Sequence, residues 1–215
     1  MKRILSICLG LLIFMNTTVG QIVGGSNSYS RSDNSQTSVV KNHLFGILSV
    51  PLGDFGSKDM YNAKVGYGLG YQILAGSGLI KYSSQILLTY NSAKWSFTDY
   101  RREYDYYTHN WYGYYDIYTY NLGFLNTTLL QGINIMSPGN AVSFYGELST
   151  GISMLAYTGD FSDADMEFSV PIRVGAGVAF NKRINLGLKY MTDVIKFTDD
   201  KINCSQLNLT VGLMF

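Results

Sequence analysis

The sequence predicts an all-β protein, an eight-stranded antiparallel up-and-down transmembrane β-barrel. Three observations support this fold class. Apolar and small polar residues alternate along eight segments, long and short connections alternate between them, and aromatic residues lie near the segment ends. Most segments match the roughly 9–11 residues that a tilted membrane strand needs and exceed the roughly 5–6 residues common in soluble strands. The predicted strands cover residues 43–51, 62–74, 79–91, 118–132, 141–155, 167–180, 183–192 and 203–215.

Composition and charge exclude several classes of protein. The chain has 215 residues, of which 47% are hydrophobic and 14% are charged. Its 16 Lys and Arg residues balance 15 Asp and Glu residues, which excludes a nucleic-acid binder that depends on a basic surplus. The apolar and aromatic content excludes an acidic disordered chain.

The first 20 residues predict a secretory signal peptide. Lys2 and Arg3 precede an apolar stretch over residues 4–15, and small residues follow, so we expect cleavage before Gln21. The apolar stretch is shorter than the roughly 20 residues of a membrane-spanning helix, which argues against an anchor. Residues 21–41 are polar and rich in Ser and Asn, and they predict a disordered N-terminal arm in the periplasm.

The last predicted strand shows the alternation most clearly. One of its faces carries Leu207, Leu209, Val211, Leu213 and Phe215. The fourth strand is the least regular because Asn126 interrupts its apolar face, and we expect a β-bulge there.

Long and short connections between the predicted strands alternate along the chain. A transmembrane barrel has this pattern when both termini lie in the periplasm, because long loops then face outside and tight turns face the periplasm. Residues 42–215 are therefore predicted to form an outer-membrane barrel. The long connections cover residues 52–61, 92–117, 157–166 and 193–202, and the short ones cover residues 75–78, 137–140 and 181–182.

A soluble eight-stranded cup, such as a lipocalin, is the alternative fold, and it would turn its apolar face inward. Here the other face consists mainly of Gly, Ser, Thr and Asn, which suit a narrow lumen, whereas the apolar face would be insoluble in water. Lipid suits the apolar face, and barrel closure leaves no strand edge unpaired. The glycines expected on the lumen face are Gly66, Gly68, Gly70, Gly123, Gly151, Gly175, Gly177, Gly187 and Gly212.

Aromatic residues predict two girdles at the water interfaces. The girdle at the loop end is expected to contain Tyr90, Tyr120, Phe168 and Tyr190. The girdle at the turn end is expected to contain Tyr82, Phe144, Phe180 and Phe215.

The pattern of residues 42–215, with its alternating terminal strand, resembles the small outer-membrane β-barrels of Gram-negative bacteria of the OmpA/OmpX type. The resemblance implies that Phe215 is part of the signal read by the barrel-assembly machinery, and that periplasmic chaperones accompany the chain. It is specific for fold and location and says little about activity. We expect no periplasmic domain after the barrel, which argues against a peptidoglycan anchor.

Four charged side chains are predicted to form a network in the lumen: Lys64, Glu147, Arg173 and Lys189. Glu147 and Arg173 fall at similar depth on consecutive strands, so we expect an ion pair between them. Buried charges are stable when paired. Two interpretations remain open: the charges plug the interior, or they line a path for ions.

The second long connection has an unusual composition, with nine tyrosines between residues 100 and 120. Tyrosine offers a large contact area and a polar tip at small entropic cost, as binding surfaces require. One interpretation is recognition of a sugar or protein outside the cell; the other is a β-ridge in which the tyrosines pack on one another. The candidate contact residues are Tyr104, Tyr106, Tyr107, Trp111 and Tyr112.

Little in the sequence supports an enzyme. The two histidines are His43, at the start of the first strand, and His109, which lies near Asp105 and Asp116. His109 and these carboxylates have the residue types of an acid–base pair, but so polar a loop brings them together by coincidence. We interpret Cys204 as a small filler on the lumen side. No catalytic residue and no cofactor are expected. A metal site is not expected either, because the sequence has no histidine cluster or cysteine pair.

The sequence therefore predicts an integral outer-membrane protein with a structural or surface-interaction role. Its expected partners are outer-membrane lipid, the assembly machinery and chaperones, and an extracellular sugar or protein, but not nucleic acid. A narrow channel for ions or small solutes is the first alternative. A lipid A-modifying membrane enzyme is the remote one, and the fold alone does not decide among these functions.

Overall fold

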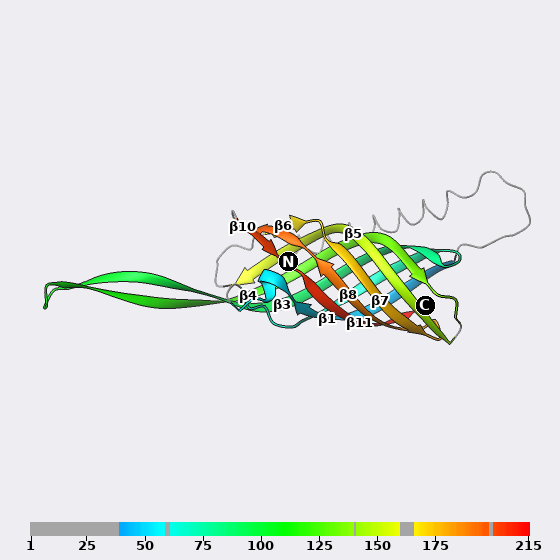
Figure 1. Ribbon diagram of the computed structural model, residues 1–215, viewed down its shortest axis with the longest axis horizontal. Coiled ribbons are helices and arrows are strands. Elements are labelled where there is room, and N and C mark those ends of the chain that lie inside the picture. The colour runs from blue at the N-terminus through cyan, green and yellow to red at the C-terminus, as the bar shows by residue number, and fades with distance from the viewer. Residues whose placement is uncertain (1–38, 59–60, 140, 160–165, 198–199) are drawn as a thin grey trace, which may run out of the picture.

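The computed structural model describes residues 39–58, 61–139, 141–159, 166–197 and 200–215. They form a closed antiparallel barrel from which one long hairpin projects (Figure 1). The predicted signal peptide and residues 21–38 of the predicted arm lie outside the described residues. The barrel begins at Val39 and not at residue 42, because residues 39–41 pair with residues 74–76.

Eight strands form the barrel wall, in the order β1, β2, β3, β4, β5, β7, β8 and β11, and pairing of β11 with β1 closes the ring. This confirms the predicted fold class. β6 and β7 both pair with β5 and follow each other along the same position of the wall. They are interrupted at Pro171, which has no N–H to donate to the ladder. The elements are β1 (Val39–Pro51), α2 (Gly53–Gly56), β2 (Gly66–Gly76), β3 (Ile80–Asp105), β4 (Asn110–Met136), β5 (Val142–Gly159), β6 (Met166–Ser169), β7 (Ile172–Phe180), β8 (Ile184–Thr192), β9 (Val194–Phe197), β10 (Asp200–Asn203) and β11 (Gln206–Met214).

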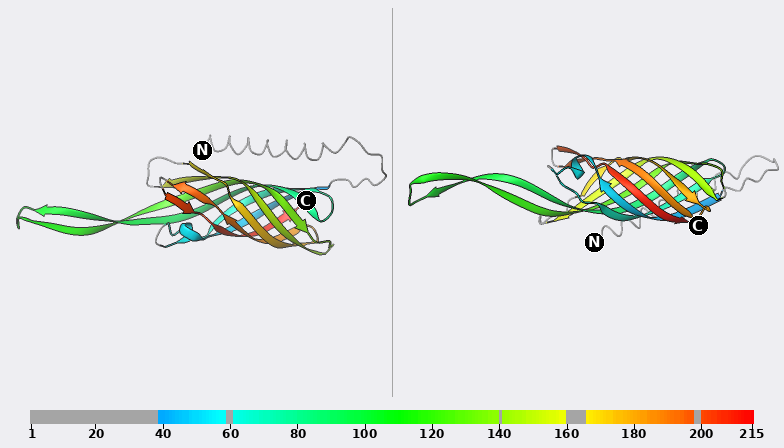
Figure 2. Two further views of the ribbon diagram at one scale, coloured as in Figure 1. Left: turned by 45° about the horizontal axis from the view of Figure 1, so that its top comes forward. Right: turned by 60° about the horizontal axis from the view of Figure 1, so that its bottom comes forward.

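Tight turns join the strands at the end of the barrel where the C-terminus lies (Figure 2). In the turn between β7 and β8, Arg183 N donates to Phe180 O at 2.9 Å. Asn181 and Lys182 have φ angles of 48° and 55°, the geometry of a type I′ turn. The short connection predicted at residues 181–182 is thus confirmed.

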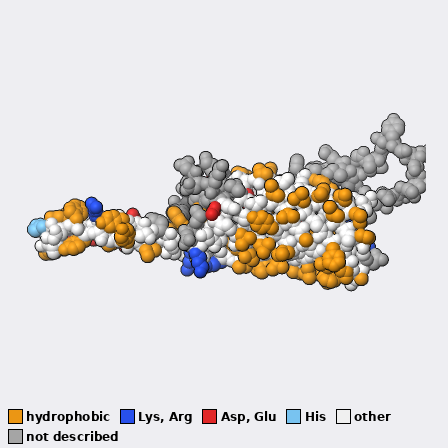
Figure 3. All heavy atoms as spheres, viewed as in Figure 1, with side chains coloured by type: hydrophobic (Ala, Val, Ile, Leu, Met, Phe, Trp, Pro, Cys, Tyr) orange, Lys and Arg blue, Asp and Glu red, His pale blue; other side chains and the backbone are white. Residues whose placement is uncertain are grey.

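The outer surface of the wall is an apolar band (Figure 3). Leu69, Val174 and Leu213 are each more than half exposed on it. Such a surface is unstable in water, and the hydrocarbon of a bilayer is the solvent that suits it. Among the described residues, no helix has the length and apolarity required to cross a membrane.

The aromatic girdles match the prediction except at one residue. Phe168 and Phe144 are exposed on the outer surface at opposite ends of the wall. Tyr120 instead lies in the projecting hairpin, where its ring is 6.1 Å from that of Trp95.

The predicted bulge at Asn126 is wrong. β4 pairs continuously with both neighbours through this residue, which lies opposite Thr89 on one side and Leu155 on the other. Asn126 points inward together with Leu122 and Phe124, which are buried in the barrel. Gly123 therefore lies on the outer face and not on the lumen face.

The predicted loop over residues 92–117 is a continuation of β3 and β4. The last pairs that join these strands to their wall neighbours are Tyr67–Tyr90 and Leu122–Gly159. Beyond them, the strand pairs described for β3 and β4 join these two strands to each other, from Lys94–Asn121 to Asp105–Asn110. We call residues 94–121 the ribbon; at roughly 3.3 Å per residue it is about 40 Å long. The segment therefore has the paired-strand form of the β-ridge interpretation. The predicted loop over residues 193–202 likewise contains a hairpin, β9–β10.

Buried side chains occupy the loop end, the middle and the turn end of the barrel interior. At the loop end, Phe55 of α2 inserts into the mouth, and its ring meets that of Phe124 edge-on at 4.9 Å. Charged and polar residues occupy the middle. The apolar layer at the loop end, which we call the outer layer, consists of Phe55, Tyr61, Ala63, Ala93, Leu122, Phe124, Leu155 and Cys204. The layer at the turn end consists of Leu74, Met136, Tyr145, Ala179 and Met214.

Candidate functional site

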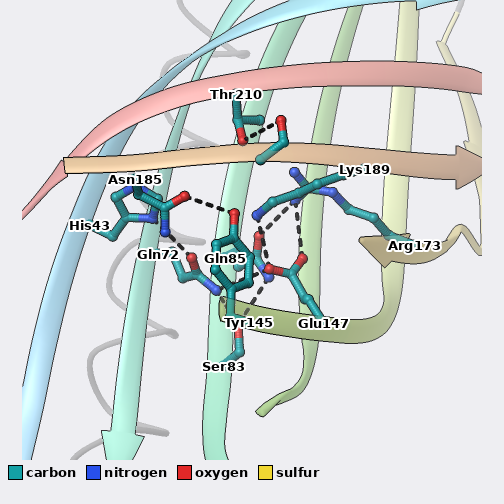
Figure 4. Close-up of polar contacts among 11 residues, drawn as sticks. His43, Gln72, Ser83, Gln85, Tyr145, Glu147, Arg173, Asn185, Lys189 and Thr210 are labelled. Carbon is teal, nitrogen blue, oxygen red and sulfur yellow. Dashed lines mark hydrogen bonds and ion pairs between the residues drawn. The ribbon is translucent and has the colours of Figure 1, made fainter. Parts of the chain in front are cut away.

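Three charged side chains meet in the middle of the lumen (Figure 4). Lys189 Nζ donates to Glu147 Oε2 at 2.9 Å, and Arg173 Nη1 lies 3.8 Å from Glu147 Oε1. All three side chains are fully buried. We call Glu147, Arg173 and Lys189 the lumen cluster. Alternation along β5, β7 and β8 directs them inward, as predicted, because each lies an even number of residues from other inward positions of its strand.

Amide side chains add further polar contacts around the lumen cluster. Arg173 Nη1 donates to Gln85 Oε1 at 2.6 Å. Gln72 Nε2 donates to Ser83 Oγ at 2.8 Å, and Gln72 Oε1 lies 3.1 Å from His43 Nδ1. The network thus links strands on opposite sides of the barrel (Figure 4).

Aromatic rings pack against the same charges. Lys189 Nζ lies 5.1 Å from the centroid of the Phe45 ring and 5.8 Å from that of Tyr145. Phe45 has room in the lumen because it lies opposite Gly70 and Gly212, where any side chain would collide with it. The charges are paired and enclosed, which favours the plug over the permeation path.

Lys64 does not belong to the lumen cluster. β2 begins at Gly66, two residues after it, so Lys64 is not in the wall at all. Its side chain is exposed and donates to Asn62 Oδ1 at 2.9 Å. The prediction that Lys64 faces the lumen is wrong because alternation was extended beyond the true start of the strand.

The ribbon has two chemically different faces, set by the alternation of its paired strands. One face carries Asp99, Glu103 and Asp116, and Arg101 Nε bridges the first and last of these at 3.5 and 3.6 Å. The other face carries no acidic residue. Its members are Lys94, Ser96, Thr98, Tyr100, Arg102, Tyr104, Trp111, Gly113, Tyr115, Ile117, Thr119 and Asn121.

A hollow of about 430 Å³ lies at the tip of the ribbon, and we call it the tip hollow. The Tyr104 and Tyr106 rings meet edge-on at 5.1 Å beside it, and Tyr107 is almost fully exposed. Two carboxylates, of Glu103 and Asp105, lie among the tyrosines. The lining residues are Glu103, Tyr104, Asp105, Tyr106, Tyr107, Tyr112 and Tyr114.

The turn that shapes the tip hollow is held by Asp105. The amide N–H of Tyr107 donates to Asp105 Oδ1 at 2.8 Å and lowers the pKa of that carboxyl below its ordinary value. His109 closes the turn with a φ of 53°. Asp105 is therefore an anion at neutral pH.

The structure brings four of the five predicted contact residues together. Tyr104, Tyr106, Tyr107 and Tyr112 line the tip hollow, whereas Trp111 packs outside it, with its ring 5.1 Å from that of Tyr104. Sequence reasoning missed Tyr114 and the acidic Glu103. Both lie on the same face as Tyr112, and this shared face was readable from alternation once the segment was taken as paired strands.

The two histidines lie at separate places in the molecule. His43 is buried in the lumen against Gln72, and His109 Nδ1 lies 3.3 Å from Tyr104 OH at the ribbon tip. Asp116 contacts Tyr118 and Arg101. Within the part of the chain that the structure describes, no group of three or more His, Cys, Asp and Glu residues is arranged to hold a metal ion.

Cys204 and Phe215 lie at opposite ends of the last wall strand. Cys204 is buried in the outer layer, as a filler would be. Phe215 is exposed on the outer surface, and its backbone exchanges two hydrogen bonds with Asn42. Its role as an assembly signal stays a prediction.

Comparisons with known proteins bear on the fold. No family model and no curated protein matches the chain. Neisserial surface protein A (NspA) is similar with a TM-score of 0.50 and 12% identity, over 81% of this chain and 95% of that one. Ail, the attachment invasion locus protein of Yersinia pestis, in complex with the heparin analogue sucrose octasulfate, is similar with a TM-score of 0.47 and 15% identity. The similarity covers 83% of this chain and 99% of that one. The N-terminal β-barrel domain of Pseudomonas aeruginosa OprF is similar with a TM-score of 0.45 and 13% identity, over 83% of this chain and 99% of that one. The chain has the fold of the small eight-stranded outer-membrane barrels.

Proposed function

We propose that this chain is an integral outer-membrane protein of a Gram-negative bacterium that uses its ribbon as a contact site for an extracellular ligand. The observation that carries this proposal is the tip hollow, which gathers five tyrosines and two carboxylates about 40 Å from the barrel. The signal peptide that the sequence predicts over residues 1–20 accounts for export in this proposal. With tight turns facing the periplasm, the ribbon extends away from the cell.

The chemistry of the tip hollow favours a sugar over other ligands. Aromatic rings stack on the apolar faces of sugar rings, and the carboxylates of Glu103 and Asp105 accept hydrogen bonds from hydroxyl groups. Tyr106 and Tyr107 are the most exposed of the lining tyrosines. A protein segment with basic residues is the alternative ligand.

Replacing Tyr106 and Tyr107 by Ala is expected to weaken ligand binding about thirtyfold or more, since aromatic anchors of binding sites are commonly worth ~2 kcal/mol. The measurement is binding of the purified barrel to an array of immobilised glycans, with adhesion of cells that display the chain as a second readout. The matched control is Tyr100→Ala with Tyr115→Ala, two ribbon tyrosines outside the tip hollow. Equal binding by the Y106A/Y107A variant and the wild type would refute the proposed site.

The wild-type barrel is expected to give no discrete conductance steps in a planar lipid bilayer, because the outer layer, the lumen cluster and the turn-end layer fill its interior. Altered gel mobility of the unboiled protein verifies that the sample is folded. Regular conductance steps from folded protein would restore the channel alternative.

A further inference from the structure

The lumen cluster contains one more positive charge than negative charge. Lys189 Nζ and Arg173 Nη1 lie 2.9 and 3.8 Å from the two oxygens of the Glu147 carboxylate, so one anionic group serves two cations. All three side chains are fully buried, where a charge without a counter-charge is costly. We propose that the lumen binds a monovalent anion of the size of chloride beside Arg173.

Arg173 keeps donors that the described residues do not use. Its Nη1 donates to Gln85 Oε1 at 2.6 Å, whereas its Nε and Nη2 have no hydrogen-bond partner in the described part of the chain. These two nitrogens share one edge of the planar guanidinium, and their N–H bonds form a fork that suits an anion. Buried polar atoms are almost always satisfied by protein, water or an ion, and an anion best satisfies donors that carry a positive charge.

Two neutral side chains with unused donors lie beside the two cations. Ser149 lies opposite Arg173 across the β5–β7 ladder, and Asn208 lies opposite Lys189 across the β8–β11 ladder. Both side chains are buried, and the described residues provide no hydrogen-bond partner for the Ser149 hydroxyl or for either polar atom of the Asn208 amide. The hydroxyl and the amide N–H can therefore join the guanidinium fork around one anion.

The other buried carboxylate of the described lumen does not balance the excess charge at this place. Asp193 lies two residues beyond Met191, the ladder partner of Arg173, in the direction of the loop end. The Arg173 side chain reaches the opposite way, toward Glu147. Accordingly, the ion pairs that Arg173 and Lys189 form with described residues are both made with Glu147.

The enclosure of the site decides which anion fits. The Phe45 ring lies 6.0 Å from Arg173 Cζ, and the outer layer and the turn-end layer occupy the two ends of the lumen. An eight-stranded barrel is only just wide enough for its own side chains, so a small anion fits better than a phosphate or sulfate. A single negative charge also matches the single excess positive charge. We expect the anion to be taken up as the barrel closes during folding.

The first test measures how folding depends on chloride. The full barrel is unfolded with urea in lipid vesicles, and sodium methanesulfonate replaces sodium chloride at constant ionic strength. A ligand that binds only the folded state raises the folding equilibrium constant in proportion to its concentration above its Kd. We therefore expect this constant to rise about tenfold for each tenfold rise in chloride.

The variant N208L/S149A removes the two neutral donors and leaves the lumen cluster intact. Leu has the branched shape of Asn, and neither removed group has a partner among the described residues, so we expect the variant to fold. Its affinity for chloride should fall about a hundredfold, because two hydrogen bonds to a charged group are lost. The matched control is Ser84→Ala, which also removes a buried hydroxyl without a described partner. Ser84 lies between the lumen residues Ser83 and Gln85, so it faces away from the lumen, and S84A should keep the wild-type chloride dependence.

The second test locates the anion. Crystals of the full barrel grown in sodium bromide should show an anomalous peak beside Arg173 Nε and Nη2, and this peak should be lost in N208L/S149A and kept in S84A. Bromide confined to the outer surface would overturn the proposal. A folding constant of the wild type that does not change with chloride, or equal weakening in S84A, would overturn it as well.

Discussion

Glu147→Ala is expected to lower the free energy of unfolding by about 3–5 kcal/mol, which is the usual cost of removing one partner from a buried ion pair. Glu147 is the single acidic member of the lumen cluster, and its carboxylate contacts both Lys189 and Arg173. Without it, two cations remain enclosed together with no anion between them. The measurement is urea-induced unfolding of the barrel in lipid vesicles, followed by gel mobility and tryptophan fluorescence.

The matched control is Glu103→Ala, which removes an exposed carboxylate of the ribbon and should change stability by less than about 0.5 kcal/mol. Glu147→Gln keeps the shape of the side chain and removes only the charge, so it separates lost attraction from lost packing. If E147A unfolded at the same urea concentration as the wild type, the lumen cluster would not stabilise the barrel.

Phe55→Ala is expected to cost a similar amount, about 3–5 kcal/mol, because a buried aromatic ring is lost and a cavity remains. The Phe55 ring is 1% exposed and fills the loop-end mouth against Phe124. The same substitution should open a route to Cys204, which lies in the outer layer. A maleimide reagent added from outside should therefore label Cys204 faster in F55A than in the wild type.

Leu52→Ala provides the control for Phe55, since Leu52 adjoins the same helical turn but is 37% exposed. It should leave both the labelling rate and the urea midpoint close to wild type. Unchanged labelling in F55A, together with unchanged stability, would show that α2 does not seal the mouth.

The barrel wall was predictable because alternation has a period of two, and a long strand repeats that signal many times. Glu147, Arg173 and Lys189 were assigned to the lumen from this period alone, and all three meet there. The same rule failed at Lys64, where the strand had not yet begun, because a periodic signal does not mark its own end.

The outer layer could not be predicted. Leu122 and Phe124 are apolar, and apolarity alone favours a lipid-facing position, yet both are buried in the lumen, where Phe124 packs against Phe55 of α2. The position of a loop residue such as Phe55 cannot be predicted from alternation, because a loop has no period of two. The tip hollow was partly predictable, since its tyrosines stand out by composition, but its carboxylates were hidden in a segment taken for a loop.

The continuity of β3 and β4 has a mechanical consequence. These two strands pass from the ribbon into the wall without interruption, so a pull on the ribbon tip acts along their axes. Backbone hydrogen bonds of an antiparallel ladder run across the strands, and a pull of this direction loads them in shear. The bonds from Tyr67–Tyr90 to Ala75–Tyr82 then share the force at once and do not unzip one by one. If the proposed ligand is held at the ribbon tip, the continuous strands transmit its tension directly to the barrel wall.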